Sequence, residues 1–441
     1  MSNPKGQQYA QQSASQQTDS ALYESGSLGD TMRTGMLNEL LRKQISPDLP
    51  ANQGENPENP KVDKTNNLLS CSVEVVDELL NNPVFERASV HGKLSQLFYQ
   101  QKAIYQQTAI DDELRKRQFI SHCGLVMSPD NCITTQLDDI RVRAFIRGID
   151  AALKEKVLTQ HDPVHVVYPA CGPFAPLLMP LIAYYMERDV FSPEQLQITL
   201  IDMQPGAVQS LGALVNQMGI SPYIKQICCM DATLYQPPEQ QNFDLVVLEA
   251  MQHGLSREGH LGIARHFAKL LSPKGSFVPQ KIIVTAMLNS AQQEFVEQWR
   301  DATSLSEKDM DQQIKSQRIL LGNILTVTAQ SLSRLPEVTL DESTTLLECG
   351  TVHIPDLSDH NEQTVLLGTR INTWGEEWIG EYDSGISHPL PEQNICVNFT
   401  PRETRPGDLL VKSGDGIKFY YRLNGLPGFL PTWTEGEKLD G

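Results

Sequence analysis

The 441-residue sequence predicts an α/β protein in which helices precede a domain with a parallel sheet and antiparallel strands follow it. Three observations predict this order. Apolar residues recur with a helical period from 68 to 157, strands and helices alternate from 158 to 277, and short β runs with hairpin signals return from 278 to 441. The change of period near 277 marks the predicted boundary between the two larger domains.

Residues 1–67 are predicted to be a disordered polar tail. They are rich in Gln, Ser, Asn and Pro, and they cannot bury enough apolar surface to offset the entropy lost on ordering. At the other end of the chain, 278–441 is predicted to be an antiparallel, barrel-like domain. A helical pattern interrupts this domain, and we predict a helical insert over about 291–335.

Composition narrows the class of protein. The net charge of −18 argues against nucleic-acid binding as the main role, because DNA and RNA are also negatively charged. The longest apolar stretch, Val166–Met186, contains four prolines that interrupt a continuous helix, so we expect no membrane span. The polar N-terminus shows no signal-peptide pattern and the eight cysteines form no CxxC pair, which predicts a cytoplasmic protein with reduced thiols.

The alternating region opens with "VHVVYPACGPFAPLL". An apolar strand ends at Tyr168, and a turn of small residues follows it, Ala170, Cys171 and Gly172. A turn without bulky side chains lets a ligand approach the backbone and the start of the next helix. Because a GxGxxG pattern is absent, this turn alone does not identify the ligand.

Two further strands end in acids. Asp202, followed by Met203, ends the strand "ITLID", where a carboxylate can accept both hydrogen bonds from a ribose diol. Asp231, followed by Ala232, ends "IKQICCMD", where it can receive an exocyclic amine. The alternative for Asp202 is a helix-capping aspartate, and the alternative for Asp231 is a turn aspartate.

The fourth strand, "FDLVVLE", ends at Glu249, and a second acid, Glu258, follows nine residues later. Acids after the second, third and fourth strands outline a nucleoside-binding crevice at the carboxyl ends of the sheet. No Lys/Arg cluster is present for a pyrophosphate, so S-adenosylmethionine is favoured over a dinucleotide. Two carboxylates can also grip a planar guanidinium and hold its nitrogen against a methyl donor. Alternatively, Glu258 is an ordinary acid in the first turn of the next helix.

The segment "FDLVVLEAMQHGLSREGHLGIARHFAKLLSPKGSFVPQ" resembles the double-Glu loop of the protein arginine methyltransferases and the family's passage from a Rossmann-type domain into a β-barrel. "LDDIRVRAFIRGI" resembles the family's D-x-V-R segment and supplies Asp138 and Arg141. "ISHPLPEQNICVNF" resembles its Thr-His-Trp loop, with Ser387 and His388 in place of Thr-His.

The resemblance implies an S-adenosylmethionine-dependent methyltransferase that acts on a guanidinium-like nitrogen of a protein or peptide. It implies that Arg141 binds the cofactor carboxylate and that the insert forms a dimerisation arm, hence a homodimer. The predicted catalytic residues are Glu249, Glu258 and His388, together with His253, whose imidazole could act as a general base, and no metal is predicted. The predicted cofactor-binding residues are Arg141, Tyr168, Ala170, Cys171, Gly172, Asp202, Met203, Asp231, Ala232 and Glu249.

The chain departs from the family pattern at several positions. Tyr168 stands where many methyltransferases have an acid, Pro389 replaces Trp, and the aromatic Y-F-x-x-Y segment is not clearly present. His253 is either a general base or a loop histidine, His388 a catalytic or a surface-loop histidine, and Arg141 a ligand or a helix-surface residue. A non-arginine peptide or small-molecule acceptor, and an inactive methyltransferase-like scaffold, therefore remain alternatives.

Overall fold

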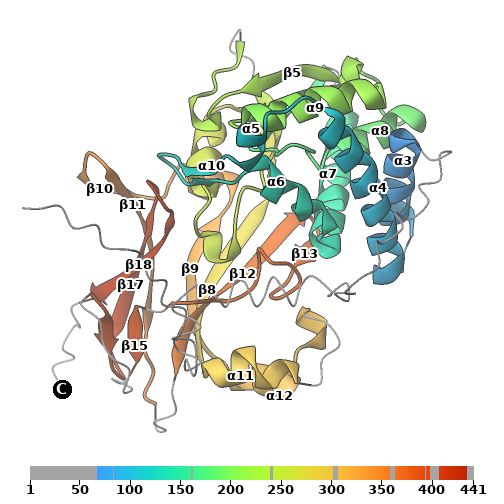
Figure 1. Ribbon diagram of the computed structural model, residues 1–441. Coiled ribbons are helices and arrows are strands. Elements are labelled where there is room, and N and C mark those ends of the chain that lie inside the picture. Colours follow the sequence, from blue (N-terminus) through green and yellow to red (C-terminus); the bar gives the residue numbers. More distant parts are fainter. Residues whose placement is uncertain are drawn as a thin grey trace, which may run out of the picture. The chain divides into compact units, whose positions relative to one another are not determined.

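A five-stranded parallel sheet lies at the centre of the computed structural model (Figure 1). The first strand along the chain, β3, is central, with β4 and β5 on one side and β6 and β7 on the other. Strands β3, β4 and β6 are rich in Val, Ile and Leu and are almost entirely buried, as expected for strands covered on both faces. The strands are β3 (Val164–Pro169), β4 (Leu196–Asp202), β5 (Ile224–Cys229), β6 (Phe243–Val247) and β7 (Leu271–Val278).

The structure describes 67–82, 84–159, 162–238, 242–300, 306–357, 363–392, 394–397 and 407–434. These residues all belong to one unit of the chain, Asn56–Gly441. The tail predicted for 1–67 lies outside the described residues except for Asn67, whose side chain accepts a hydrogen bond from the Ser70 N–H at the start of α3.

Helices connect consecutive strands of the parallel sheet. Helix α8 (Met179–Glu187) lies between β3 and β4, α9 (Pro205–Met218) between β4 and β5, and α10 (His260–Ala268) between β6 and β7. The long helix α7 (Asp139–Thr159) precedes β3 and packs against both sheet regions through β3, β6, β7 and the later strand β12. The predicted α/β alternation with a parallel sheet is thus confirmed.

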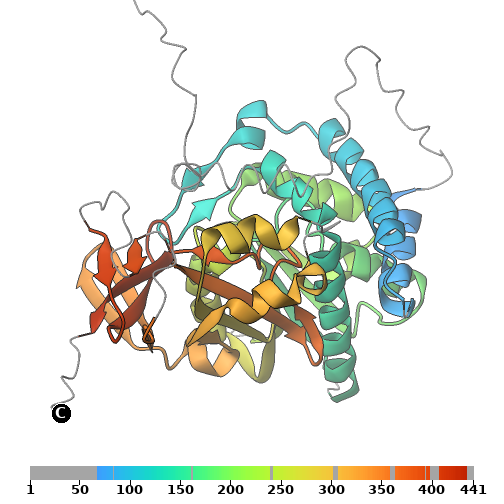
Figure 2. The same cartoon turned by 90° about the horizontal axis from the view of Figure 1, so that it is seen from below.

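Two helices before α7 form an additional layer. Helix α3 (Leu68–Asn81) packs on α8 and on α4 (Arg87–Gln107), and α4 packs on α9 (Figures 1 and 2). The stretch between α4 and α7 is not purely helical. It contains α5 (Asp112–Lys116), a small hairpin of β1 (Phe119–Ile120) and β2 (Leu125–Val126), α6 (Pro129–Cys132) and the 3₁₀ helix η1 (Ile133–Leu137).

The later strands are mostly antiparallel, as predicted, but the described strands form separate sheets rather than a closed barrel. Gly350 of β11 lies close to β9, so that an added Cβ would be 2.8 Å from the Asn323 carbonyl oxygen. The two strands nevertheless belong to different sheets, and no ladder of backbone hydrogen bonds joins them. One sheet contains β8 (Lys281–Asn289), β9 (Ile319–Val327), β12 (Thr364–Trp374), β13 (Glu377–Ile379) and β14 (Leu390–Pro391); another contains β10 (Glu337–Asp341), β11 (Thr344–His353), β17 (Gly416–Arg422) and β18 (Gly428–Thr434). A parallel pair, β15 (Ile395–Val397) and β16 (Leu409–Val411), completes the set.

The region predicted as a helical insert, 291–335, is helical only in part. Its helices are short: α11 (Ala291–Phe295), η6 (Glu297–Trp299), η7 (Glu307–Asp309), α12 (Gln312–Gln317) and α13 (Ala329–Leu332) (Figure 2). Strand β9 lies inside the same region, so the helical prediction is wrong for Ile319–Val327. This segment pairs with β8 from Ile319 to Val327 instead of forming a helix.

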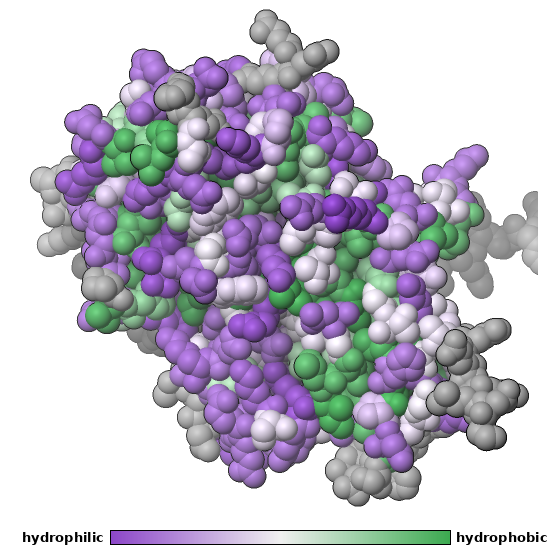
Figure 3. Space-filling model, turned by 180° about the vertical axis from the view of Figure 1, so that it is seen from behind, coloured by the Kyte–Doolittle hydropathy of each residue, from purple (hydrophilic) through white to green (hydrophobic). Residues whose placement is uncertain are grey.

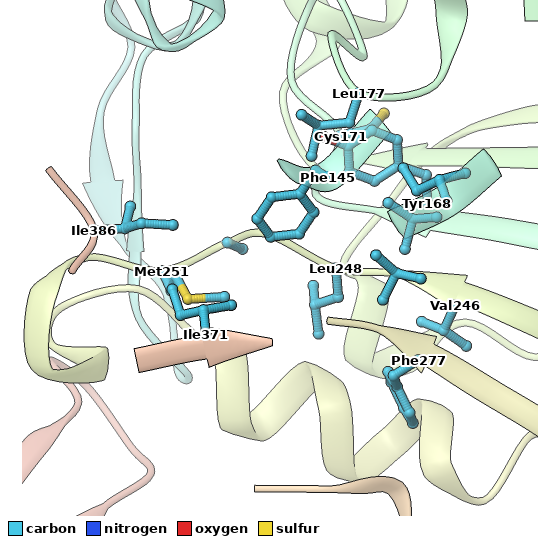
Figure 4. Packing of buried hydrophobic residues seen from close by; sticks show 14 of the residues in the cluster. Phe145, Tyr168, Cys171, Leu177, Val246, Leu248, Met251, Phe277, Ile371 and Ile386 are labelled. Atoms are coloured by element: carbon cyan, nitrogen blue, oxygen red, sulfur yellow. The ribbon is translucent and has the colours of Figure 1, made fainter. Parts of the chain in front are cut away.

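The hydrophobic core is continuous beneath the carboxyl edge of the parallel sheet. Figure 4 shows Phe145 of α7 among Tyr168, Leu248 and Met251, with Ile371 of β12 beside them. This packing joins α7, the parallel sheet and the antiparallel region. Much of the face seen in Figure 3 is hydrophilic, with a broad hydrophobic area at its lower right and smaller ones elsewhere. Within the described part of the chain, none of the helices has the length and apolarity that a membrane crossing requires.

Candidate active site

A pocket lies at the carboxyl ends of β3, β4, β5 and β6, at the point where the strand order changes direction along the sheet. Its empty volume is about 1110 Å³, part of it open to solvent. Among the predicted site residues, those that line it are Arg141, Tyr168, Ala170, Cys171, Gly172, Asp202, Met203, Asp231, Ala232, Glu249 and Glu258.

The turn after β3 exposes its backbone to the pocket. Ala170 and Gly172 have positive φ angles of 51° and 68°, so the chain turns sharply at the end of the strand. A Cβ added at Gly172 would meet only Cys132, whose Cβ would be 3.8 Å away. The absence of a side chain at Gly172 therefore leaves room for a ligand to approach the backbone, which is how the sequence was interpreted.

Asp202 ties this turn to the next loop. Its Oδ2 accepts a hydrogen bond of 2.8 Å from the Gly172 N–H, and its Oδ1 accepts one of 2.8 Å from the Gln204 N–H. Burial raises the pKa of Asp202 to about 6, although both N–H donors favour the charged form. Helix α9 begins with Gln204 as its N-cap and has no side-chain cap, so Asp202 is not a conventional capping residue.

Asp231 has the turn role that was considered as its alternative, and it also lines the pocket. Its Oδ1 accepts hydrogen bonds from the Thr233 N–H at 2.8 Å and the Thr233 hydroxyl at 2.7 Å, which caps the short 3₁₀ helix η3 (Ala232–Leu234). Its Oδ2 lies 3.3 Å from Nδ1 of His122 at the tip of the β1–β2 hairpin.

Arg141 is buried in the first turn of α7 and is not a helix-surface residue. Its Nη1 donates to Oε1 of Glu249 at 2.9 Å, and its Nη2 donates to the Thr135 carbonyl at 2.6 Å. Oδ2 of Asp138 lies 3.7 Å from Nε of Arg141, and Oδ1 of Asp138 accepts a hydrogen bond of 3.2 Å from the Arg141 backbone N–H. These contacts hold the Arg141 guanidinium at the wall of the pocket.

The two glutamates have different surroundings. Burial raises the pKa of Glu249, and the neighbouring Arg141 opposes that rise. Glu258 precedes Gly259, the N-cap of α10, so it lies in the loop and not in the first turn of the helix. Its Oε1 accepts a hydrogen bond of 3.0 Å from Nε2 of Gln252.

The two histidines do not line the pocket. His388 is buried against the ring of Tyr382, at a centroid distance of 5.2 Å, so it is not a surface-loop residue. Burial lowers its pKa to about 4, opposed by Asp138. His253 is half-buried in the 3₁₀ helix η5 (His253–Leu255) of the loop between the glutamates. Neither position supports direct contact with a ligand in this pocket.

Sequence reasoning missed the hairpin of β1 and β2, which covers one side of the pocket. Ser121, Cys123, Gly124 and Met127 line it. The hairpin is held at its base by Gln204, whose Nε2 donates to the carbonyls of residues 117 and 127 at 2.7 and 3.0 Å. The sequence gives no positive sign of this hairpin, because the family's aromatic Y-F-x-x-Y segment is not clearly present in this stretch.

Charge in the pocket is strongly unbalanced. Among its described lining residues, the ionisable acids are Asp202, Asp231, Glu249 and Glu258, and Arg141 is the one guanidinium. Such a lining attracts a cationic ligand and repels phosphates. Within the described ranges, no group of three or more His, Cys, Asp or Glu side chains is arranged to hold a metal ion.

Fold and site together define an α/β protein with an acidic ligand pocket at the carboxyl edge of a parallel sheet. No family model matches the chain, and no curated protein matches it. Among solved structures, it is similar to a chain of the "Trypanosoma brucei PRMT1 enzyme-prozyme heterotetrameric complex with AdoHcy". The identity is 14% with a TM-score of 0.37, over 70% of this chain and 94% of that chain.

Proposed function

We propose that the protein is an S-adenosylmethionine-dependent methyltransferase that acts on a cationic, guanidinium-like nitrogen of a protein or peptide. The observation that carries the proposal is the position of Arg141, Asp202, Glu249 and Glu258 around one pocket at the carboxyl ends of β3, β4 and β6. A single guanidinium among several carboxylates suits a ligand that combines a carboxylate, ribose hydroxyls and a positive charge.

The residues present fit this cofactor. Arg141 would hold the carboxylate of its amino-acid part, and Asp202 would accept hydrogen bonds from the ribose diol. Asp231 would border the base. The bare backbone at Gly172, where a Cβ would have open space except towards Cys132, would allow the cofactor to approach the turn after β3.

When bound, the cofactor supplies an electrophilic methyl group on a positively charged sulfur. The residues of this chain would position the acceptor for in-line attack, which is the main requirement of such a displacement. Glu249 and Glu258 would bind the acceptor cation and favour localisation of its charge away from the attacking nitrogen. The hairpin of β1 and β2 would exclude water from one side of the pocket.

A second candidate is a protein that binds the cofactor without transferring its methyl group. The hydrogen bond between Arg141 and Glu249 favours it, because one of the two acids is already engaged by a cation of the chain itself. If this alternative holds, the pocket binds the cofactor as tightly as a methyltransferase pocket would, but no acceptor is methylated.

Incubation of cell lysate with the protein and isotopically labelled methyl donor, followed by mass spectrometry, tests the proposal. Label on arginine or another cationic nitrogen that disappears with Glu258→Gln is the expected result. Cofactor binding without any labelled product would support the second candidate. Failure to bind the cofactor would contradict both.

A further inference from the structure

Gln252 lies in the loop between the two glutamates, at the N-cap position of the 3₁₀ helix η5, and its side chain makes no capping hydrogen bond to that helix. Its side chain is half-buried and turns back towards the end of the loop. Nε2 is 3.0 Å from Oε1 of Glu258 and 4.0 Å from the sulfur of Met127 in the segment that follows β2. The amide therefore contacts both the second acid and the hairpin side of the pocket.

The backbone of this loop is fixed by contacts on both sides. Leu255 and Arg257 adopt positive φ angles of 52° and 66°. The Tyr421 hydroxyl donates to the Leu255 carbonyl at 2.6 Å, and the Arg257 N–H donates to the Pro427 carbonyl at 2.8 Å. On the other side, the Leu125 N–H donates to the Arg257 carbonyl at 2.7 Å. These bonds place the Glu258 backbone, but they do not fix the torsions of its side chain.

The Glu258 side chain lies among other negative charges. Asp202, Glu249 and Glu258 line the same pocket as Cys132, and their negative charges add to burial in raising the pKa of the Cys132 thiol. Carboxylates at such a site repel one another, and a flexible glutamate can relieve the repulsion by rotating towards solvent. A neutral amide donor opposes that rotation without adding a competing cation.

We propose that Gln252 is a positioning residue whose amide holds the Glu258 carboxylate in the pocket, facing the cationic part of the acceptor. The inference rests on the proposed function, because it assigns a role to Glu258 in binding the acceptor. Gln252 would act on the acceptor through Glu258 and would leave the cofactor side of the pocket unchanged.

Two substitutions separate this role from simple packing. Gln252→Met keeps the length of the side chain and removes the donor, whereas Gln252→Ala removes both. A packing role would be preserved by Met, but a positioning role would be lost in both variants. Gln293→Met is the matched control, because Gln293 is also half-buried and its amide bonds Gln317 in the insert, away from the pocket.

The test is calorimetric titration of each variant with a blocked arginine tripeptide, in the presence of saturating S-adenosylhomocysteine. We expect Gln252→Met and Gln252→Ala to weaken peptide binding about tenfold or more, as for loss of a hydrogen bond to a charged group. Affinity for S-adenosylhomocysteine should stay within about twofold, and the control should match the parent. In a Glu258→Gln background the same changes should have little further effect.

The outcomes distinguish the two proposals. Equal peptide affinity in the parent and in Gln252→Met, with S-adenosylhomocysteine bound by both, would overturn the role of Gln252 and leave the proposed function intact. A parent protein that does not bind S-adenosylhomocysteine would overturn the proposed function. A parent that binds S-adenosylhomocysteine but not the peptide would overturn the guanidinium-like acceptor and the role of Gln252 with it.

Discussion

Asp202 is buried at the end of β4, and its pKa of about 6 lies above the 3.8 of an exposed aspartate because burial disfavours the charged form. The folded protein therefore holds this proton more tightly than the unfolded chain does. Its contribution to the free energy of unfolding falls as pH rises from 3.8 to about 6. A ligand that donates hydrogen bonds to the ionised carboxylate would favour loss of that proton.

We expect the affinity for S-adenosylmethionine to fall as the pH is lowered through about 6, because protonated Asp202 loses acceptor capacity for the ribose diol. Below that pH the loss should approach about tenfold per pH unit. Titrations between pH 5 and pH 8, on the order of one per half unit, check this expectation for the parent and for Asp202→Asn. If the affinity of Asp202→Asn for S-adenosylmethionine depends on pH as that of the parent does, the ribose does not bind at Asp202.

The two glutamates should respond differently to the same substitution. Glu249→Gln removes the negative charge nearest to buried Arg141, and breaking such an ion pair costs about 3–5 kcal/mol of stability. Glu258→Gln changes a residue that is bonded by a neutral amide, and we expect a much smaller shift of the melting temperature. Turnover should fall in both by about a hundredfold to a thousandfold. Thermal unfolding and labelled-methyl assays on both variants measure the contrast, and a stable, fully active Glu258→Gln would exclude Glu258 from the reaction.

Residues that end strands could be located from the sequence, whereas residues that reach across the fold could not. Asp202 and Glu249 each follow a mostly apolar strand, so the sheet brings them to one edge. Gln252 gave no such signal, because its contact with Glu258 depends on loop residues with positive φ. The burial of His388 also depends on long-range packing, here against Tyr382.

At the scale of elements, the hairpin of β1 and β2 connects the pocket to the antiparallel region. At the tip of the hairpin, the His122 carbonyl accepts a hydrogen bond of 2.8 Å from the N–H of Gly425, which lies in the turn before β18. Gly124 lies so close to the double-Glu loop that an added Cβ would be 2.5 Å from the Gly259 backbone nitrogen. The hairpin and the loop that carries Glu258 are therefore in backbone contact.

Gly124→Ala should displace the hairpin from this loop. We expect a loss of about 1–3 kcal/mol in stability, as for overpacking, together with weaker binding of the acceptor. Gly92→Ala is the control: Gly92 lies inside α4 with nothing within 4 Å of an added Cβ, so alanine should stabilise by about 0.5–1 kcal/mol. Chemical denaturation of both variants measures the difference. An unaltered pocket and unaltered stability in Gly124→Ala would contradict the close packing.

Long elements were easier to predict than short or irregular ones. The buried strands and α7 carry strong periodic patterns, whereas "LSPKG", with its proline and glycine, is an irregular part of β7. There the pairing jumps from Phe243–Leu271 to Leu245–Ser276, so the residues between them bulge from the strand. Helix is predicted where β9 forms, because the pairing of β9 with β8 is not visible locally. The partners of the later sheets depend on contacts far apart in sequence, which is why a barrel was predicted where separate sheets are found.

At the scale of the whole molecule, the homodimer stays a prediction. Within the insert, the buried side chain of Arg318 pairs with Glu294 of α11, and its pairing with Glu381 ties the insert to the rest of the chain. We expect sedimentation at micromolar concentration to show a dimer, and removal of α11 and α12 to give a monomer. A monomeric parent under these conditions would count against the dimerisation arm.

The central claim is that the acidic pocket binds S-adenosylmethionine, and calorimetric titration of the full chain with this compound tests it most directly. We predict saturable binding of about one molecule per chain near neutral pH. Asp202→Ala should reduce the affinity about a hundredfold or more, since two hydrogen bonds to a charged group are lost. Absence of binding by a folded protein at millimolar ligand, or equal affinity in Asp202→Ala, would contradict the assignment of the pocket.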